Sequence, residues 1–206
     1  MKKVVLKVVF VVGSLLTCVA VANAQIPISF SGQVGYASPG GGWFKNDAGE
    51  KMSKFGIGVD FDVLYHLEQM DNKLGVGLTY NSSFLFGADM GDSGLDIGLY
   101  GLSLYGVKGQ YRFFNSKVSP YGSLGLGLSQ FAEPDITITN GDGTTQTYKG
   151  EKSFGFGIRP EIGVEFGAFV ISCGYIVPMK YKIEDVKESA SCFQVNLGVR
   201  ITLFDR

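Results

Sequence analysis

The stretch from Phe154 to Phe166 decides the fold of this chain, and it reads Phe-Gly-Phe-Gly-Ile-Arg-Pro-Glu-Ile-Gly-Val-Glu-Phe. Every even-numbered position in it is apolar, and every odd-numbered position is glycine or charged. Successive side chains of a β-strand point to opposite faces, so this strand has one apolar face and one face that carries ions. A strand that borders lipid on one side and a narrow polar lumen on the other has this pattern.

The same alternation recurs about eight times along the chain. We expect strands at about residues 28–37, 54–65, 73–86, 96–113, 119–131, 152–166, 169–179 and 191–204. The first half of the segment 96–113 breaks the phase, because Tyr100, Leu102 and Leu104 occupy positions that the alternation reserves for polar residues. A β-bulge or a bulky lumen would each explain the break.

The connections between the expected strands alternate in length. Long polar segments lie at about 38–53, 87–95, 132–151 and 180–190, and shorter ones lie at about 66–72, 114–118 and 167–168. Outer-membrane barrels have long extracellular loops and short periplasmic turns. With both termini in the periplasm, every connection follows that rule, which favours an all-β, eight-stranded antiparallel up-and-down transmembrane β-barrel.

The start of the chain has the features of a secretory signal peptide. They are the basic residues Lys2, Lys3 and Lys7, an apolar stretch from Val4 to Leu16, and the sequence Ala22-Asn23-Ala24. We therefore expect a cleavable signal peptide at 1–24 and one barrel domain at 25–206. A helical membrane anchor is the weaker alternative, because Lys7 and Gly13 interrupt a short run. A lipoprotein would use Cys18, but Thr17 before it fits a lipobox poorly.

Composition supports a barrel and excludes other classes. No other segment approaches 18 uninterrupted apolar residues, yet the chain is 45% hydrophobic with 16 Phe and 10 Tyr. A closed barrel is the other structure that satisfies every backbone group in lipid. The net charge of −1 gives no reason to expect a nucleic-acid partner. Cys173 and Cys192 fall on opposite-facing phases of neighbouring strands, so no disulfide between them is expected.

Eight charged residues are predicted to point into the lumen. They are Asp60, Asp62, Lys108, Arg112, Arg159, Glu161, Glu165 and Arg200. An eight-stranded barrel is only wide enough for its own side chains, so these charges must pair across it. The first interpretation is a structural plug of ion pairs. A narrow ion or proton path is the second, and paired carboxylates for acid–base catalysis are the third.

Enzyme classes lack the residues that they need. His66 is the only histidine, and it falls at the expected periplasmic end of the strand 54–65, away from the outer leaflet where membrane-barrel lipid enzymes act. We interpret it as an interfacial turn residue. No metal-ligand spacing, nucleophile elbow or phosphate loop is present, so no catalytic residue, metal or cofactor is expected. Pairs such as Gly75-x-Gly77 open no helix, and a crowded barrel interior explains them better.

Aromatic residues gather near the expected strand ends. Phe55, Phe84, Phe86, Phe154 and Phe193 lie toward the outer rim, and Tyr65, Tyr111, Phe113, Phe166 and Phe169 lie toward the periplasmic rim. Two such girdles are typical of a membrane barrel. Core packing in a soluble barrel is the alternative interpretation.

The segment 135–148 carries a hairpin signal, because Asn140-Gly141-Asp142-Gly143 separates two β-forming runs. The strands around it are expected to project as a ribbon whose exposed edges accept a partner strand. The candidate interaction residues are Ile136, Ile138, Asn140, Asp142 and Tyr148. Asn140 and Asp142 offer too few ligands for a calcium loop.

The leader, the alternating segments, the rhythm of loop lengths and the last strand, Leu197 to Phe204, resemble the small OmpA/OmpX-like outer-membrane β-barrels of Gram-negative bacteria. The resemblance implies a monomer in the outer membrane that contacts outer-membrane lipids and is folded by the outer-membrane assembly machinery. That machinery recognises a terminal aromatic residue, and here Asp205 and Arg206 follow Phe204. We expect no periplasmic peptidoglycan-binding domain after the barrel, so the resemblance is not to the full-length anchoring members of the family.

The expected role is structural or in surface interaction, such as adhesion or envelope integrity, with a surface protein as a possible partner. Narrow porin-like permeation of small solutes or ions is the alternative function. A lipid-modifying enzyme and a soluble lipocalin-like binder are less favoured.

Overall fold

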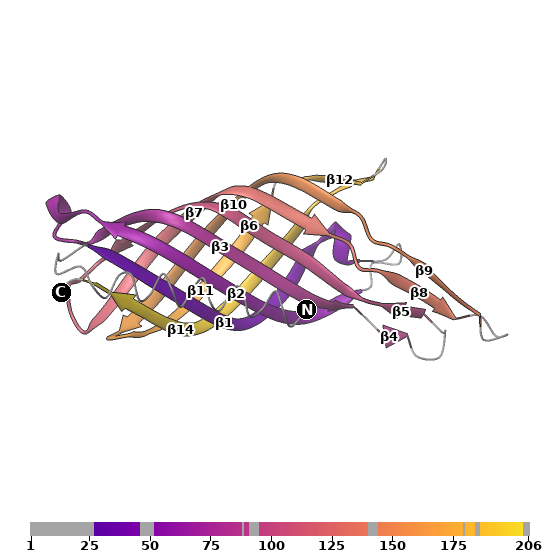
Figure 1. Ribbon diagram of the computed structural model, residues 1–206, viewed down its shortest axis with the longest axis horizontal. Helices are drawn as coiled ribbons and strands as arrows, with labels where there is room; N and C mark the ends of the chain where they lie inside the picture. The colour runs from indigo at the N-terminus through magenta and orange to yellow at the C-terminus, as the bar shows by residue number, and fades with distance from the viewer. Residues whose placement is uncertain are drawn as a thin grey trace.

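The computed structural model describes residues 27–45, 52–87, 89–90, 95–139, 144–178, 180–183 and 186–203. The expected leader, 1–24, lies outside these residues. Eight long strands form a closed barrel in the order β1-β14-β11-β10-β7-β6-β3-β2 (Figure 1). They are β1 (Ile28–Gly41), β2 (Ser53–His66), β3 (Leu74–Gly87), β6 (Leu99–Arg112), β7 (Val118–Ala132), β10 (Lys152–Phe166), β11 (Phe169–Pro178) and β14 (Ala190–Thr202). All neighbouring pairs are antiparallel, so the predicted fold class is confirmed.

The shorter elements lie at the two ends of the barrel. At the end with long connections, here called the loop end, are η1 (Gly42–Phe44), β4 (Asp89–Met90), β5 (Leu95–Ile97), β8 (Ile136–Thr139), β9 (Thr145–Tyr148), β12 (Tyr181–Ile183) and β13 (Val186–Glu188). At the opposite end, here called the turn end, is η2 (Glu68–Met70). The strands β4, β5, β8 and β9 form a separate sheet that extends beyond the barrel (Figure 1). Neither helix in the described part of the chain is long and apolar enough to cross a membrane.

The barrel wall has an apolar outside and a polar inside. On β10 the side chain of Ile162 is 68% exposed, while the neighbouring Glu161 is 3% exposed. Leu78 on β3 and Leu197 on β14 are exposed in the same way. The alternation in the sequence therefore translates directly into an outer surface of large apolar side chains around a charged interior.

The phase break in the segment 96–113 has a simple origin. The register of β6 with β3 runs without interruption from Leu99, which pairs with Phe86, to Tyr111, which pairs with Leu74. Tyr100, Leu102 and Leu104 keep the inward phase and are buried in the lumen. A bulky lumen, and not a bulge, explains the break.

Glycines on the barrel wall leave space for the large side chains of the lumen. A Cβ atom added to Gly163 would lie 2.5 Å from the Tyr121 ring, and one added to Gly174 would lie 2.9 Å from the Arg159 guanidinium group. Both distances are well below ordinary contact. The large side chains of the lumen therefore depend on glycines on the neighbouring strands.

The two groups of aromatic residues point outward, as predicted. The group toward the loop end is Phe55, Phe84, Phe86, Phe154 and Phe193, and all of these rings are exposed. The group toward the turn end is Tyr65, Tyr111, Phe113, Phe166 and Phe169, and these are exposed as well. Their positions near opposite ends of the strands give the outer wall an aromatic belt at each rim.

Candidate functional site

The structure brings all eight predicted charges into the lumen. They come from four strands, with Asp60 and Asp62 on β2, Lys108 and Arg112 on β6, Arg159, Glu161 and Glu165 on β10, and Arg200 on β14. Each is at most 3% exposed. Four acidic groups face four basic groups, so their formal charges cancel within the barrel.

Arg159 holds the part of this network nearest the loop end. Its Nη2 atom lies 2.7 Å from Oδ2 of Asp60, and its Nη1 atom forms an ion pair with Glu161 on the same strand. Asn81 donates a hydrogen bond of 3.1 Å to Asp60 and another, of 2.7 Å, to Gln194. The Asp60 carboxylate is thus held by both a cation and an amide.

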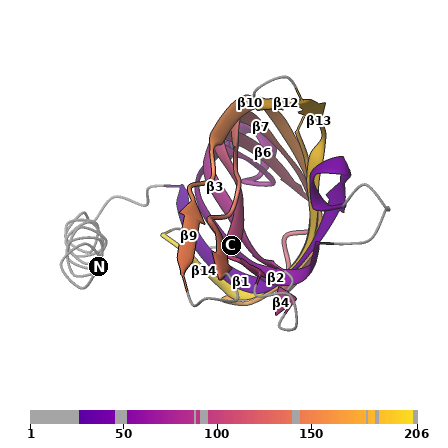
Figure 2. The same cartoon turned by 90° about the vertical axis from the view of Figure 1, so that its right-hand side faces the viewer.

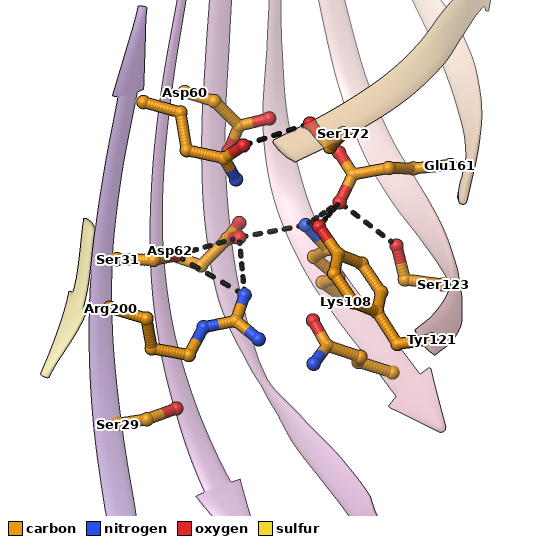
Figure 3. Close-up of polar contacts among 12 residues, drawn as sticks. Ser29, Ser31, Asp60, Asp62, Lys108, Tyr121, Ser123, Glu161, Ser172 and Arg200 are labelled. Atoms are coloured by element: carbon orange, nitrogen blue, oxygen red, sulfur yellow. Dashed lines mark hydrogen bonds and ion pairs between the residues drawn. The ribbon is translucent and has the colours of Figure 1, made fainter. Parts of the chain in front are cut away.

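Lys108 joins the two sides of the barrel at the centre of the network (Figure 3). Its ammonium group lies 2.7 Å from Oδ2 of Asp62 on β2 and 2.9 Å from Oε1 of Glu161 on β10. Tyr121 donates a hydrogen bond of 3.0 Å to the same oxygen of Glu161. One lysine therefore bridges two carboxylates that come from opposite walls.

Arg200 and Glu165 extend the network toward the turn end. Arg200 forms a close ion pair with Glu165 and lies 3.8 Å from Asp62. Nε of Arg112 lies 3.5 Å from Oε2 of Glu165. The Arg200 guanidinium also lies 5.4 Å from the centre of the Tyr121 ring, close enough for a cation–π contact. The network thus runs without a gap from Asp60 to Arg112.

The interpretation of His66 as an interfacial turn residue is wrong. It is the last residue of β2, but its side chain is fully buried inside the turn end of the lumen. The Nε2 atom lies 2.8 Å from the Ser29 hydroxyl, and Arg112 lies 3.0 Å from both ring nitrogens. His66 therefore extends the polar network beyond Arg112, because the final residue of β2 still points into the lumen.

An apolar cluster, here called the aromatic cap, fills the lumen at the loop end. It consists of Ala37, Phe44, Leu85, Tyr100, Leu102, Phe131, Ile176, Tyr181, Ala190 and Cys192, with Trp43 packed against it. Phe44 is 2% exposed although it comes from η1 in a connection. Its ring centre lies 5.4 Å from that of Tyr100 and 5.9 Å from that of Phe131, both in edge-to-face geometry.

Two connections reach over the mouth to complete the aromatic cap. The ring centre of Trp43 in η1 lies 5.4 Å from that of Phe131 in a tilted arrangement, and Trp43 donates a hydrogen bond of 2.9 Å to the carbonyl of Glu188. Tyr181 of β12 lies 5.5 Å from Phe131 and shares a hydrogen bond with Ser129. Burial raises the pKa of the Tyr181 hydroxyl to about 12, so it stays neutral at physiological pH. Figure 2 shows the ring of strands end-on with β12 at its rim.

Several of these residues were not predicted as site residues. Tyr121 shares the odd, inward phase of Ser123, and Asn81 and Gln194 also fall on inward positions, so strand parity could have identified them as network members. Trp43 and Phe44 lie in an expected loop. No periodicity extends there, and the sequence therefore contained no signal for their insertion.

The predicted hairpin is present as β8 and β9, but only one of its two edges is exposed. Ile136 on β8 pairs with Tyr148 on β9, while Ile138 pairs with Gln146. Asn140 and Asp142 lie outside the described residues. The prediction that both edges are exposed is wrong, because β5 pairs with β8 on the other side. The β9 edge remains, and its residues from Thr145 to Tyr148 are exposed.

The two cysteines of the described chain are free thiols. Cys192 is buried in the aromatic cap, whereas Cys173 lies on β11 and is partly exposed. Cys192 pairs with Ile176 and Cys173 pairs with Val195, so the thiols lie at different heights, as the sequence predicts.

Comparison with known proteins identifies the fold. No protein-family model matches the chain, and no curated protein matches it by sequence. The chain is similar to the solved structure of Ail, the attachment invasion locus protein of Yersinia pestis, with 18% identity and a TM-score of 0.53. The match covers 85% of this chain and 100% of that chain. The chain has the fold of the small eight-stranded outer-membrane β-barrels, as its resemblance to OmpA/OmpX-like barrels implies.

Two further solved structures match at lower TM-scores. Neisserial surface protein A has 18% identity and a TM-score of 0.48, over 84% of this chain and 96% of that chain. OprG from Pseudomonas aeruginosa has 14% identity and a TM-score of 0.43, over 87% of this chain and 99% of that chain.

Proposed function

We propose that this chain is an outer-membrane barrel protein with a structural or surface-interaction role. The observation that carries the proposal is the inverted polarity of the barrel. Large apolar side chains are exposed around the wall, while eight charged side chains are buried inside it. Exposed apolar surface is costly in water at about 25 cal/mol per Å², and hydrocarbon tails remove that cost.

Membrane insertion can be tested on cells and on gels. We expect the mature chain in the outer-membrane fraction, after removal of residues 1–24 by a signal peptidase. Unheated samples should migrate differently from boiled samples, because closed barrels resist detergent. Recovery of the folded chain in the periplasmic fraction would instead support a lipocalin-like binder.

We propose that side chains plug the lumen. Two separate sets of side chains fill the lumen and support this proposal. They are the charge-balanced network, with Lys108 between Asp62 and Glu161, and the aromatic cap at the loop end. The purified barrel should give no steady conductance in a planar lipid bilayer. A porin of known conductance in the same bilayer is the control for insertion conditions.

A narrow ion or proton path is the second candidate, and one observation favours it. The amide of Asn196 is buried in the lumen, and neither its Oδ1 nor its Nδ2 atom has a hydrogen-bond partner among the described residues. Buried polar atoms of this kind are often bridged by water. A steady conductance that changes in Arg159→Gln or Glu161→Gln barrels would favour this candidate over the plug.

The surface role is proposed to lie in the sheet that extends beyond the barrel. The exposed β9 edge offers backbone groups to which a partner strand can add. Deletion of residues 136–147 should abolish surface binding to a protein partner, while Lys182→Ala on the separate β12 hairpin should leave it unchanged. A deletion that spares every surface-binding phenotype would remove this part of the proposal.

Catalysis is not part of the proposed role. His66 is enclosed at the turn end by Ser29 and Arg112, where no outer-leaflet lipid reaches it. Strains that overproduce the chain should therefore show an unchanged lipid A profile by mass spectrometry. A new lipid A species that disappears in a His66→Asn variant would contradict this assignment.

A further inference from the structure

The sheet beyond the barrel continues the barrel wall without a shift in register (Figure 1). The backbone N–H of Gly98 donates to the carbonyl of Asp135, and this bond links the β6–β7 ladder to the β5–β8 ladder in one register. A backbone bond from Glu133 to Glu151 links the β7–β10 ladder to the β8–β9 ladder in the same way. The side chains of β8 and β9 therefore keep the phase that the wall strands have.

This phase gives the sheet an apolar outer face. Ile136 pairs with Tyr148, and Ile138 pairs with Gln146. All four are at even positions, which point outward on β7 and β10. The Tyr148 hydroxyl donates a hydrogen bond of 3.2 Å to the Gln146 side chain, so these two side chains share one face.

The other face of the sheet is polar, and neither face is covered by a second layer of the described chain. Thr137 and Thr147 lie on the inner face, where their hydroxyl oxygens are 3.2 Å apart. All residues of β8, on both faces, are partly exposed, and all residues of β9 are exposed. The ring of Tyr148 is 57% exposed.

The neighbouring strand extends the apolar outer face. On β5, Leu95 occupies the position paired with Ile138, and Ile97 occupies the position paired with Ile136. None of these positions carries a charge. A two-fold axis brings identical residues together, so a face without charges can pack on its own copy without repulsion.

Lipid chains do not reach this face. On β10 the two aromatic belts are marked by Phe154 and Phe166, which are twelve residues, or about 40 Å, apart along the strand. At a tilt of about 40° this is about 30 Å along the barrel axis, the full thickness of a hydrocarbon core. Tyr148 precedes Phe154 by six more residues, or about 15 Å along the axis, and so lies beyond the headgroups. An apolar face in water at that height calls for a protein partner.

We propose that the outer face of the β4-β5-β8-β9 sheet packs against the same face of a second copy of this chain in the same membrane. Each copy would supply one layer of a small two-layer β-sandwich, with the sheets about 10 Å apart. This packing leaves the β9 edge free for the surface role proposed above. The inference rests on the proposed membrane location of the barrel.

The size of the face favours a membrane neighbour over a soluble protein. A stable interface buries about 800 Å² on each partner, which is more than a sheet of four strands with two to four residues each offers. Two barrels in one membrane share the same plane and orientation. Their effective concentration is therefore high, so a small interface is sufficient.

The test measures association of the mature barrel in phosphatidylcholine vesicles. Energy transfer between copies labelled with donor and acceptor at the N-terminal amine is followed as lipid is added at constant protein. Transfer in the wild-type barrel should exceed that of randomly distributed monomers. In an Ile136→Thr, Ile138→Thr barrel, which keeps β-branched residues but loses apolar area, dimerisation should weaken roughly tenfold or more.

A matched control is the Thr137→Ser, Thr139→Ser barrel, which loses side-chain volume from the inner face of the same strand. It should dimerise like the wild-type barrel, and heat-modifiable gel mobility shows that each variant is folded. Wild-type transfer equal to that of random monomers at every lipid ratio would overturn the proposal, as would dimers that persist in the isoleucine variant. A barrel that needs detergent but stays monomeric refutes only the dimer, whereas a folded chain that needs no detergent refutes the membrane location itself.

Discussion

The two halves of the lumen are filled by different chemistry. Toward the turn end, the space is occupied by charges that need named partners, such as Lys108 between Asp62 and Glu161. Toward the loop end, it is occupied by rings such as Phe44 and Phe131, which need only shape and apolar neighbours. The comparison shows that the lumen of one narrow barrel can be filled both by paired ions and by apolar packing.

This difference has consequences for tolerance to substitution. A buried charge that loses its partner keeps its full desolvation cost, whereas an apolar cluster can repack around a similar side chain. Substitutions that remove a charge from the charged half should therefore be strongly destabilising, whereas the aromatic cap should tolerate apolar substitutions. The variants below test that contrast, from the largest expected effect to the smallest.

Lys108→Met should have the largest effect. It keeps a similar volume but leaves Asp62 and Glu161 without the cation between them. We expect a loss of roughly 3–5 kcal/mol in the free energy of unfolding. Equilibrium urea unfolding in phospholipid vesicles measures it, and a loss below about 1 kcal/mol would mean that the network does not depend on matched partners.

Val107→Arg tests whether lipid surrounds the outer wall, and its loss of stability can be compared with those of variants in the two halves of the lumen. Val107 lies in the middle of β6 and is exposed, so an arginine there should cost roughly 2–4 kcal/mol if lipid surrounds it. Val164→Arg, two residues from the end of β10, is the matched variant and should cost about 1 kcal/mol or less, since arginine reaches the interface there. Equal tolerance at the two positions in the same unfolding assay would argue against a lipid-facing wall.

Phe44→Leu should have a smaller effect than either change. The aromatic cap surrounds Phe44 with apolar side chains, so an apolar replacement should cost about 1 kcal/mol. Trp43 fluorescence provides a local signal of whether η1 stays packed against Phe131. A loss as large as that of Lys108→Met would show that the cap is no more permissive than the charged network.

Ser123→Thr is the mildest change. Ser123 donates a weak hydrogen bond of 3.4 Å to Glu161, and threonine keeps the hydroxyl. A change within about 0.5 kcal/mol is expected. A large loss in the unfolding assay would show that the lumen has no room for one additional methyl group at this position.

The sequence predicted the charged half well because its residues obey strict alternation. Asp60, Lys108, Arg159 and Arg200 each fall on the inward phase of a strand, and a narrow barrel forces inward charges to meet. Pairing partners are set by strand register and barrel shear. Those depend on long-range contacts, so the bond between Lys108 and Glu161 was not predicted.

The aromatic cap could not be predicted in the same way. On β6 the inward residues Tyr100 and Leu102 are apolar while the outward residues between and after them are Gly101 and Ser103, so the polarity of the alternation is reversed there. Phe44 enters the lumen from a connection, where no strand phase applies. His66 was misassigned because its place at the strand end suggested a turn, although the inward phase continues through the final residue of β2.

The central claim is that lipid, and not a protein interior or water, surrounds the apolar outer wall. The most direct test is light scattering combined with circular dichroism on the purified mature chain, with and without detergent. The account predicts a monodisperse, β-rich barrel only when detergent or lipid is present, and aggregation in its absence. A monodisperse and folded chain in buffer alone would contradict it.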